Sequence, residues 1–305
     1  MRAAEVCFSV AISPRCGYLV AVIELAPALE RSVPHLAELQ ARALADYAFP
    51  LTNEPTELAR RLAVDAIDLG ASWIATMDKR DVGFAFVARR GGFARIDSLG
   101  VVPEARTKGV GRSLVDAVLA GGRAHGDVKL VLEVDDASPP ALRLYKSAGF
   151  HSWRRLVGWE RDAPNVLTKD PTRTVVELPL RHAAWAAAKH AEKDLPWQFA
   201  PESIANLTPP YRAFEHDHSA YCIVRLMPDD TLKVRALIVR TEARRRGLGA
   251  VVLAGAVKQL GAKRIVVPPW CPEGLWDDFF KRAGFHQSKH AQVELRRQIE
   301  KAAAG

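Results

Sequence analysis

The chain has 305 residues, of which 49% are hydrophobic and 26% are charged, and a formal net charge of +8 at pH 7. This length suits two domains of roughly 150 residues, each able to bury its own core. The composition is ordinary for a soluble globular protein. No stretch reaches the roughly 18 uninterrupted apolar residues of a membrane helix, so we expect no membrane span.

The cysteines and the charges narrow the setting and the partners. Four cysteines without C-x-x-C spacing argue against a disulfide framework or a zinc site and favour a reducing, cytoplasmic location. Charged residues interrupt the apolar runs near the N-terminus, so a signal peptide is not expected. The positive charge favours anionic partners such as phosphorylated small molecules, or serves solubility alone. No basic stretch is interleaved with aromatic residues, which gives little support to a nucleic-acid interface.

The first half of the chain is expected to alternate strands and helices, from apolar periodicity and turn residues. The expected strands are 17–25, 72–77, 82–89, 93–102 and 129–134, and the expected helices are 33–47, 52–64, 107–125 and 139–147. The strand 129–134 is almost continuously apolar, which indicates burial on both faces.

The second half repeats this order more compactly after a segment rich in proline, asparagine and charge. We expect an N-terminal domain at 1–163, a linker at 164–173 and a C-terminal domain at 174–305. The elements expected after the linker are strand 174–180, helices 182–193 and 201–207, two strands within 220–239, helix 245–260, strand 263–267 and helix 272–282.

One segment occurs twice, with an offset of 138 residues. Residues 99–111 and 237–249 are identical at seven of thirteen positions, including both glycines of an R-x-x-G-x-G turn. An Ala-Gly-Phe triplet follows each copy, at 148–150 and at 283–285. Because this period is too long for a solenoid repeat, the chain is best interpreted as two copies of one domain.

The repeated turn lies where a strand ends and a helix begins. The first turn of a helix has backbone N–H groups without partners, and the helix dipole adds positive potential there. Glycines allow an anion to approach the backbone closely, so the turn is a candidate phosphate site. Two common phosphate motifs are absent: G-x-x-x-x-G-K-S/T does not occur, and Leu114 stands where G-x-G-x-x-G needs its third glycine.

Residues 99–111 fit L-x-V-x-P-x-x-R/Q-x-x-G-x-G/A, and residues 141–150 fit A-x-x-L-Y-x-x-x-G-F. Together, in this order and spacing, they resemble the GNAT superfamily of acyl-CoA-dependent N-acyltransferases, closely over 17–160 and more loosely over 174–296. The resemblance implies an α/β (α+β) fold: two tandem GNAT domains, each a mixed, mostly antiparallel sheet with helices on both faces and central strands splayed around the cofactor.

The resemblance also implies where acetyl-CoA binds. The backbone at Leu99, Gly100 and Val101 would pair with the pantetheine arm, and N–H groups of the following turn would hold the pyrophosphate. The turn residues are Arg106, Thr107, Lys108, Gly109, Val110, Gly111 and Arg112. Arg106 either neutralises phosphate or orients the loop. Ser138, a further candidate for binding acetyl-CoA, stands where the family often has asparagine.

Two residues carry the expected chemistry. The resemblance assigns Tyr145 as the acid that protonates the departing CoA thiolate, with a core aromatic as the alternative. An amine must lose a proton to attack a thioester, and Glu133, on the strand beside the cofactor strand, is our candidate base, acting through a water. The alternative for Glu133 is an inward carboxylate paired to an arginine. Asp135 and Asp136 are lesser candidates that suit helix capping better.

The second copy differs where the chemistry would occur. Phe280 aligns with Tyr145, and the strand that aligns with 129–134 ends in Val267-Pro268-Pro269, without an equivalent of Glu133. The second copy is therefore expected to be degenerate, with one acetyl-CoA bound per chain. His216-Asp217-His218 lacks a third ligand at suitable spacing, so no metal is expected.

These observations favour an acetyl-CoA-dependent N-acetyltransferase that transfers the acetyl group to a primary amine by direct attack in a ternary complex, with no metal cofactor. Two alternatives stay open: a tandem acetyltransferase similar to mycothiol synthase, in which the C-terminal half is catalytic, and a CoA-binding regulatory module without turnover. The acceptor amine and the oligomeric state do not follow from the sequence.

Overall fold

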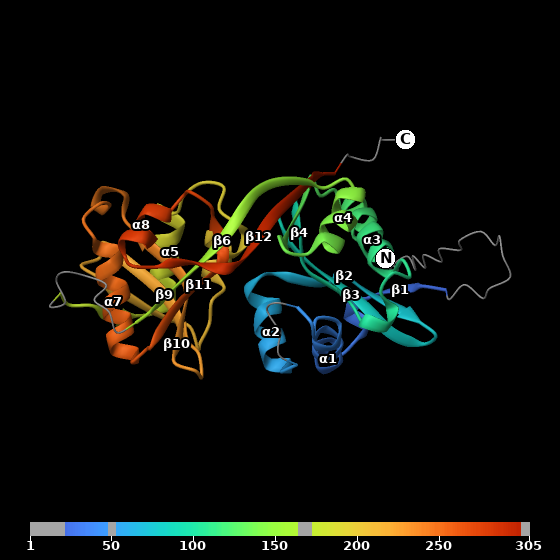
Figure 1. Cartoon of the computed structure of the whole chain (residues 1–305), viewed down its shortest axis with the longest axis horizontal. Coiled ribbons are helices and arrows are strands. Elements are labelled where there is room, and N and C mark those ends of the chain that lie inside the picture. The colour runs from blue at the N-terminus through green and yellow to red at the C-terminus, as the bar shows by residue number, and fades with distance from the viewer. Residues whose placement is uncertain (1–21, 48–52, 164–172, 300–305) are drawn as a thin grey trace. The chain divides into compact units, whose positions relative to one another are not determined.

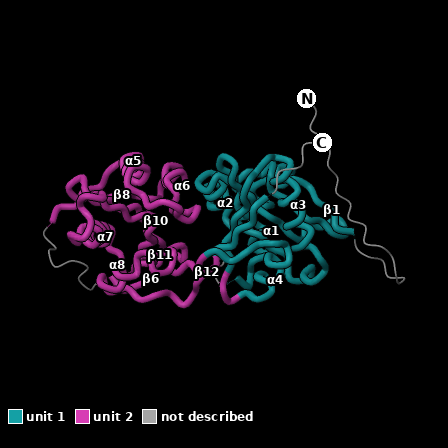
Figure 2. The backbone as a smooth tube through the Cα atoms, turned by 90° about the horizontal axis from the view of Figure 1, so that it is seen from above, with its two compact units in different colours: residues 1–134, 138–153, 294–305 teal, residues 135–137, 154–293 magenta. Residues whose placement is uncertain are grey.

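A computed structural model describes residues 22–47, 53–163 and 173–299 (Figure 1). The chain forms two compact units, coloured separately in Figure 2. Unit 1 comprises residues 1–134, 138–153 and 294–305, and unit 2 comprises residues 135–137 and 154–293. Apart from Arg173, the linker expected at 164–173 lies outside the described residues. Among the helices that are described, none is long and apolar enough to cross a membrane.

Unit 1 is a sheet covered by helices on both faces. Its elements are β1 Glu24–Pro27, η1 Ala28–Glu30, α1 Val33–Ala43, α2 Pro55–Val64, β2 Ile67–Met77, β3 Arg80–Arg90, β4 Phe93–Val101, η2 Pro103–Ala105, α3 Val110–His125, β5 Lys129–Asp135 and α4 Pro139–Ser147. The strand order is β1-β2-β3-β4-β5, followed by the C-terminal end of β12 (His286–Gln298). β1 to β4 pair antiparallel, whereas β4 and β5 pair in parallel. α1 and α2 lie on one face, and α3 and α4 on the other (Figure 1).

Unit 2 repeats this plan. Its elements are β6 His151–Asp162, β7 Val176–Leu178, α5 Leu180–His190, η3 Trp197–Phe199, α6 Pro201–Ala205, β8 Arg212–His216, β9 Ala220–Leu226, β10 Thr231–Val239, η4 Thr241–Ala243, α7 Leu248–Leu260, β11 Arg264–Pro272, α8 Asp277–Arg282 and the first part of β12. The strand order is β12-β6-β11-β10-β9-β8-β7, and β10 and β11 form the parallel pair.

The expected fold class is confirmed: each unit is a mixed, mostly antiparallel sheet with one parallel pair at its centre. β8 and β12 were not predicted. β11 also runs on to Pro272, although its expected end was Val267. Pro268 and Pro269 are tolerated because the pairing of β11 with β6 is interrupted between Val267 and Cys271, where no N–H is needed.

The C-terminal strand of each copy serves the other unit. β6 follows the first Ala-Gly-Phe triplet but, from Arg154 on, belongs to unit 2 and pairs with β11. β12 follows the second triplet and ends in unit 1, next to β5. Each unit therefore contains a strand from both copies.

Gly100, near the end of β4, is required by packing in the structure. A Cβ added there would lie 2.7 Å from Cε1 of Phe84 and 3.0 Å from Cβ of Ala43. We expect Gly100→Ala to lower the free energy of unfolding by about 1–3 kcal/mol, the usual cost of overpacking. Denaturant unfolding measures this change. Gly92→Ala is the control, because a Cβ at Gly92 meets only Val128, at 3.6 Å; equal stability of the two variants would contradict the packing.

Candidate active site and the second cavity

In unit 1 the two central strands separate. β4 and β5 pair from Phe93–Lys129 to Ile96–Leu132 and no further. Asp97 is a bulge in the pairing of β4 with β3, which resumes at Ser98. Leu99, Gly100 and Val101 pair with β3 on one side, and β5 does not pair with their other edge. That edge is available for a ligand whose amides pair with a strand.

The turn after β4 presents a row of N–H groups. Thr107 and Gly109 have positive φ angles of 62° and 87°, and Gly109 is the N-cap of α3. Within the described part of the chain, the backbone N–H groups of residues 107–112 donate no hydrogen bond, and Ser113 is the first to bond back, to the carbonyl of Gly109. Successive free N–H groups at a helix N-terminus form an anion-binding concavity.

Arg106 holds this turn in place. Its Nε donates to the carbonyl of Val101 at 3.0 Å, and its Nη2 donates to the carbonyl of Ala43 at 3.2 Å. Both Nη atoms also bind the carboxylate of Asp46, and these hydrogen bonds lower the pKa of Asp46. The guanidinium therefore fastens β4 and the turn to the end of α1, which is the loop-orienting role.

Tyr145 lies on α4, next to the first turn of α3. A Cβ on Gly111 of that turn would lie 3.3 Å from Leu144, the neighbour of Tyr145. Tyr145 is 7% exposed, its ring meets Phe150 edge-on at 5.8 Å, and its hydroxyl makes no hydrogen bond with the described residues. Burial is the main cause that raises the pKa of Tyr145, and the nearby Tyr47 adds to it. The phenol therefore keeps its proton at neutral pH.

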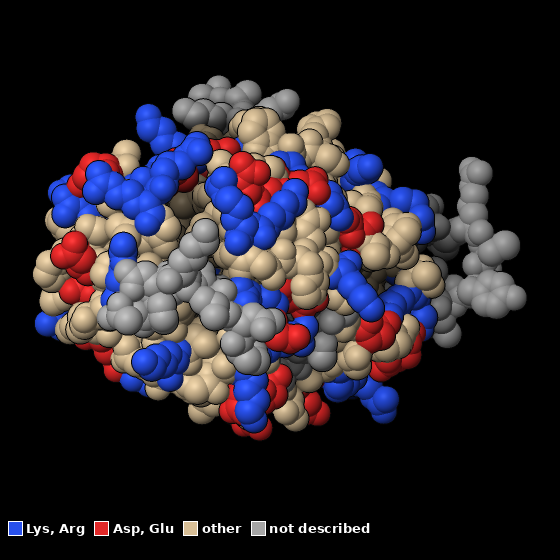
Figure 3. Space-filling model, turned by 60° about the vertical axis from the view of Figure 1, so that its left-hand side comes forward, with Lys and Arg blue, Asp and Glu red and all other residues tan. Residues whose placement is uncertain are grey.

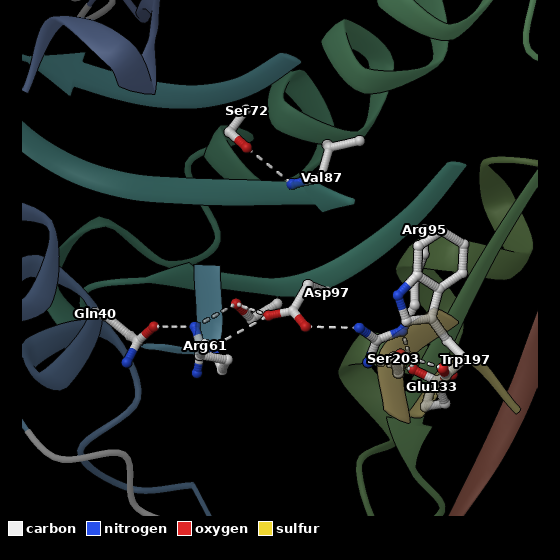
Figure 4. A network of polar contacts seen from close by, with 10 residues as sticks. Gln40, Arg61, Ser72, Val87, Arg95, Asp97, Glu133, Trp197 and Ser203 are labelled. Carbon is white, nitrogen blue, oxygen red and sulfur yellow. Dashed lines mark hydrogen bonds and ion pairs between the residues drawn. The ribbon is translucent and has the colours of Figure 1, made fainter. Parts of the chain in front are cut away.

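Glu133 lies at the end of a buried polar network (Figure 4). Nε and Nη2 of Arg95 both contact Oε2 of Glu133 at 2.8 Å, and Nη1 of Arg95 donates to Asp97 at 2.6 Å. Oε1 of Glu133 accepts no hydrogen bond from the described residues. Burial raises the pKa of Glu133 although Arg95 opposes the shift, and the Glu133 side chain is 3% exposed. The carboxylate is thus paired to an arginine through one oxygen only.

Asp97 extends the network to Arg61, whose Nε lies 3.5 Å from its carboxylate. Burial works to raise the pKa of Asp97, but Arg61 and Arg95 outweigh it and hold that pKa below its usual value. Arg95 and Asp97 were not predicted from the sequence. The available signal was two charged residues at alternate positions of an otherwise apolar strand, which is typical of inward-facing, paired charges.

The remaining predicted residues lie near the start of α4. Ser138 is the N-cap of α4, and its side chain makes no capping hydrogen bond. Asp135 accepts a hydrogen bond from the N–H of Ala137 at 2.9 Å, and Asp136 pairs with Arg155 at 3.1 Å. Neither aspartate caps the helix. Lys108 is exposed, and Arg112 pairs with Asp116 at 2.8 Å on α3.

The second turn has the same backbone as the first. Arg245 and Gly247 have φ angles of 66° and 76°, and Gly247 is the N-cap of α7. Arg244 repeats the contacts of Arg106: Nε donates to the carbonyl of Val239 at 3.3 Å, and the Nη atoms donate to His190 and Glu192. The backbone N–H groups of residues 245–249 donate no hydrogen bond to any described residue.

A cavity of about 760 Å³ opens beside this second turn within unit 2. Its walls come from the end of β10, the turn, α5 and α8, and they are mainly apolar. As in unit 1, the parallel pairing of β10 with β11 ends early, at Lys233–Val266. The sequence predicts the turn here but not the cavity, because the cavity arises from packing between separate elements.

Phe280 lies in the wall of this cavity at the position of Tyr145. Its ring stacks on that of Trp159, with the ring centroids 5.1 Å apart, and meets the ring of Phe285 edge-on, with the centroids 5.4 Å apart. Cys271 also lines the cavity, and burial raises the pKa of its thiol. Unit 2 thus has an aromatic ring without a hydroxyl group at the position of Tyr145.

Two further features bear on possible ligands: clusters of metal-ligating side chains and the distribution of charge on one face. No group of three or more His, Cys, Asp or Glu side chains that could hold a metal occurs among residues 22–47, 53–163 and 173–299. His216 bonds to the carbonyl of Thr174, and His218 to Glu215. On the face drawn in Figure 3, acidic side chains are interspersed among the basic ones.

Residues 37–150 match the family described as the Acetyltransferase (GNAT) family. A 122-residue segment is 34% identical to mycothiol acetyltransferase from Thermobispora bispora and covers 38% of this chain and 41% of that protein. The chain thus spans about two fifths of the length of the curated relatives it matches.

Two solved structures resemble almost the whole chain. A GCN5-related N-acetyltransferase from Sphaerobacter thermophilus aligns with a TM-score of 0.68 and 19% identity, covering 92% of this chain and 96% of that one. A tandem GNAT protein from the clavulanic acid biosynthesis pathway aligns with a TM-score of 0.66 and 17% identity, covering 92% and 99%. Residues 37–150 therefore match the GNAT acetyltransferase family, and the chain as a whole has the fold of a tandem GNAT protein.

Proposed function

We propose that unit 1 is an acetyl-CoA-dependent N-acetyltransferase and that its acceptor is a primary amine. The observation that carries this proposal is the open edge of β4 leading directly into a turn of free N–H groups. A pantetheine arm needs backbone partners along its amides, and a pyrophosphate needs donors at its end. Unit 1 offers both in sequence, with Tyr145 and Glu133 on the elements that flank them.

The reaction follows from the two side chains. The amine nitrogen attacks the thioester carbonyl, a C–N bond forms and the C–S bond breaks. Glu133 takes the proton of the amine through a water at Oε1, the oxygen that Arg95 leaves open. Tyr145, whose raised pKa keeps it protonated at neutral pH, gives its proton to the departing thiolate. No metal takes part in these steps.

Release of free CoA from acetyl-CoA in the presence of an amine panel tests this function. The panel includes the acceptor of mycothiol acetyltransferases, because a segment of the chain is 34% identical to one of them. We expect release that depends on one class of primary amine. Binding of acetyl-CoA without amine-dependent release would instead support a CoA-binding module without turnover.

The cavity favours a second function for unit 2: it holds a CoA thioester without turnover. It combines a turn of free N–H groups with an apolar slot, and it lacks equivalents of both Tyr145 and Glu133. On this proposal the chain binds two molecules of acetyl-CoA and turns over one of them, whereas the sequence alone favours one bound molecule.

Glutamate at the N-cap of either helix is expected to block its turn. Gly109→Glu and Gly247→Glu each add bulk and a negative charge where phosphate would bind, so each should weaken one acetyl-CoA site at least tenfold, or about 1.4 kcal/mol. The two variants are matched, since both positions have positive φ and no close neighbour. Calorimetry on each variant should find one site of unchanged affinity.

Asparagine at either glycine is the control, because it tolerates the left-handed conformation without adding charge. Full affinity at both sites in Gly109→Glu would contradict the placement in unit 1. A single site in the wild-type chain that Gly247→Glu leaves unchanged would contradict the second site.

A further inference from the structure

The end of α4 is closed by a residue far away in the sequence. Gly149 has a φ of 80°, and the N–H of Phe150 donates back to the carbonyl of Tyr145 at 3.0 Å. This arrangement satisfies the carbonyl of Tyr145 but not that of Ala148, the C-cap of α4. Nη1 of Arg297, on β12, donates to the Ala148 carbonyl. Its positive charge also suits the negative end of the helix dipole.

Arg297 and Gly149 fit each other closely. A Cβ at Gly149 would lie 3.3 Å from both Cζ and Nη1 of Arg297. The guanidinium therefore lies over the turn, in the space that a side chain at position 149 would fill. The contact depends on the shape of the turn as well as on the charge of the arginine. Arg297 is half-buried within unit 1.

Unit 2 repeats the arrangement with an arginine from the other copy. Nη1 of Arg161, on β6, donates to the carbonyl of Ala283 at the end of α8. Gly284 has a φ of 78°, and the N–H of Phe285 bonds to the carbonyl of Phe280 at 2.9 Å. The exchanged strands thus deliver one arginine to each Ala-Gly-Phe turn.

We propose that Arg297, supplied by the last strand of the second copy, is a positioning residue for Tyr145 in the first copy. This inference rests on the acid role of Tyr145 given above. Tyr145 lies three residues before the carbonyl that Arg297 holds, and its hydroxyl has no hydrogen bond of its own among the described residues. The position of the hydroxyl therefore depends on how firmly the last turn of α4 is held.

Arg297→Ala and Arg161→Ala form a matched pair. Each removes one arginine from one Ala-Gly-Phe turn, but only the first turn carries a tyrosine. We expect Arg297→Ala to lower kcat about tenfold with KM for acetyl-CoA unchanged, since small displacements of a catalytic group cost up to a hundredfold. Arg161→Ala should leave kcat within twofold. Arg297→Lys, which keeps a cationic donor, should recover most of the loss.

A double-mutant cycle separates positioning from a general loss of stability. If Arg297 acts through Tyr145, adding Arg297→Ala to Tyr145→Phe should lower kcat no further. Independent, multiplying losses would overturn the proposal, as would equal kcat losses in Arg297→Ala and Arg161→Ala. If Tyr145→Phe itself keeps full kcat, the acid role fails, which is a different outcome.

Amide hydrogen exchange supplies a readout that needs no acceptor amine. The N–H groups of Ala148, Gly149 and Phe150 bond within the turn that Arg297 covers. We expect them to exchange at least tenfold faster in Arg297→Ala, with no change in Arg161→Ala. Unchanged exchange at all three residues in Arg297→Ala would overturn the proposal whatever the chain acetylates.

Discussion

Tyr145→Phe is expected to lower kcat about a hundredfold, the lower range for loss of a general acid. The substitution removes only the hydroxyl, and the ring keeps its edge-on contact with Phe150. Acetyl-CoA affinity should stay the same, because the lost interaction belongs to the transition state. Stability should also change little, since the hydroxyl makes no hydrogen bond with the described residues. Stopped-flow release of CoA with the best amine of the panel measures the effect.

The control is Tyr221→Phe in unit 2, which removes a buried hydroxyl that donates to the carbonyl of His218 at 2.9 Å. It should leave kcat unchanged. The pH dependence adds a second check. Because burial raises the pKa of Tyr145 above its ordinary value of about 10, kcat should not fall on the alkaline side below that pH. Full turnover in Tyr145→Phe would show that Tyr145 is only a core aromatic.

Glu133→Gln is expected to lower kcat/KM about a hundredfold or more at neutral pH, as expected for loss of a general base. The base acts when it is ionised, and burial raises the pKa of Glu133. Wild-type kcat/KM should therefore rise with pH along an acidic limb, and the midpoint of this limb should lie above the ordinary glutamate pKa of about 4.3. The variant should lose this limb. A pH series of initial rates measures both effects.

Asp97→Asn is the matched control for Glu133. It removes the other carboxylate that binds Arg95 and leaves the carboxylate at position 133 in place. Both variants are expected to lower the thermal midpoint, because each removes one of the two carboxylates that bind the buried Arg95. Only Glu133→Gln should remove the acidic limb. Equal and small kinetic effects in the two variants would mean that Glu133 serves only to neutralise Arg95.

The sequence predicted the parts of the site that depend on local patterns. The strand, turn and helix around Gly109 have a fixed spacing, and the same spacing at Gly247 revealed the second copy. The structure gives both turns the same left-handed N-cap. The roles of Tyr145 and Glu133 stay predictions, while the structure adds that Arg95 occupies one oxygen of Glu133.

The parts that were missed depend on contacts between distant residues. Arg297 and the Ala148 carbonyl are 149 positions apart, and no local pattern marks β12 as a strand of unit 1. The extension of β11 was missed because prolines normally end a strand, and only the interrupted pairing with β6 makes room for them. The cavity of unit 2 likewise arises from packing, since its walls come from separate elements.

The central claim is that the first copy turns over acetyl-CoA and the second does not. The most direct measurement is the steady-state rate of amine-dependent CoA release by Gly109→Glu and Gly247→Glu, at an acetyl-CoA concentration well below the KM of the wild-type chain. We expect a rate at least tenfold lower in Gly109→Glu, because the rate then follows kcat/KM and falls in proportion to the weakened binding. The rate of Gly247→Glu should stay within about twofold of wild type. Turnover that survives in Gly109→Glu and is lost in Gly247→Glu would contradict this claim and assign catalysis to the second copy.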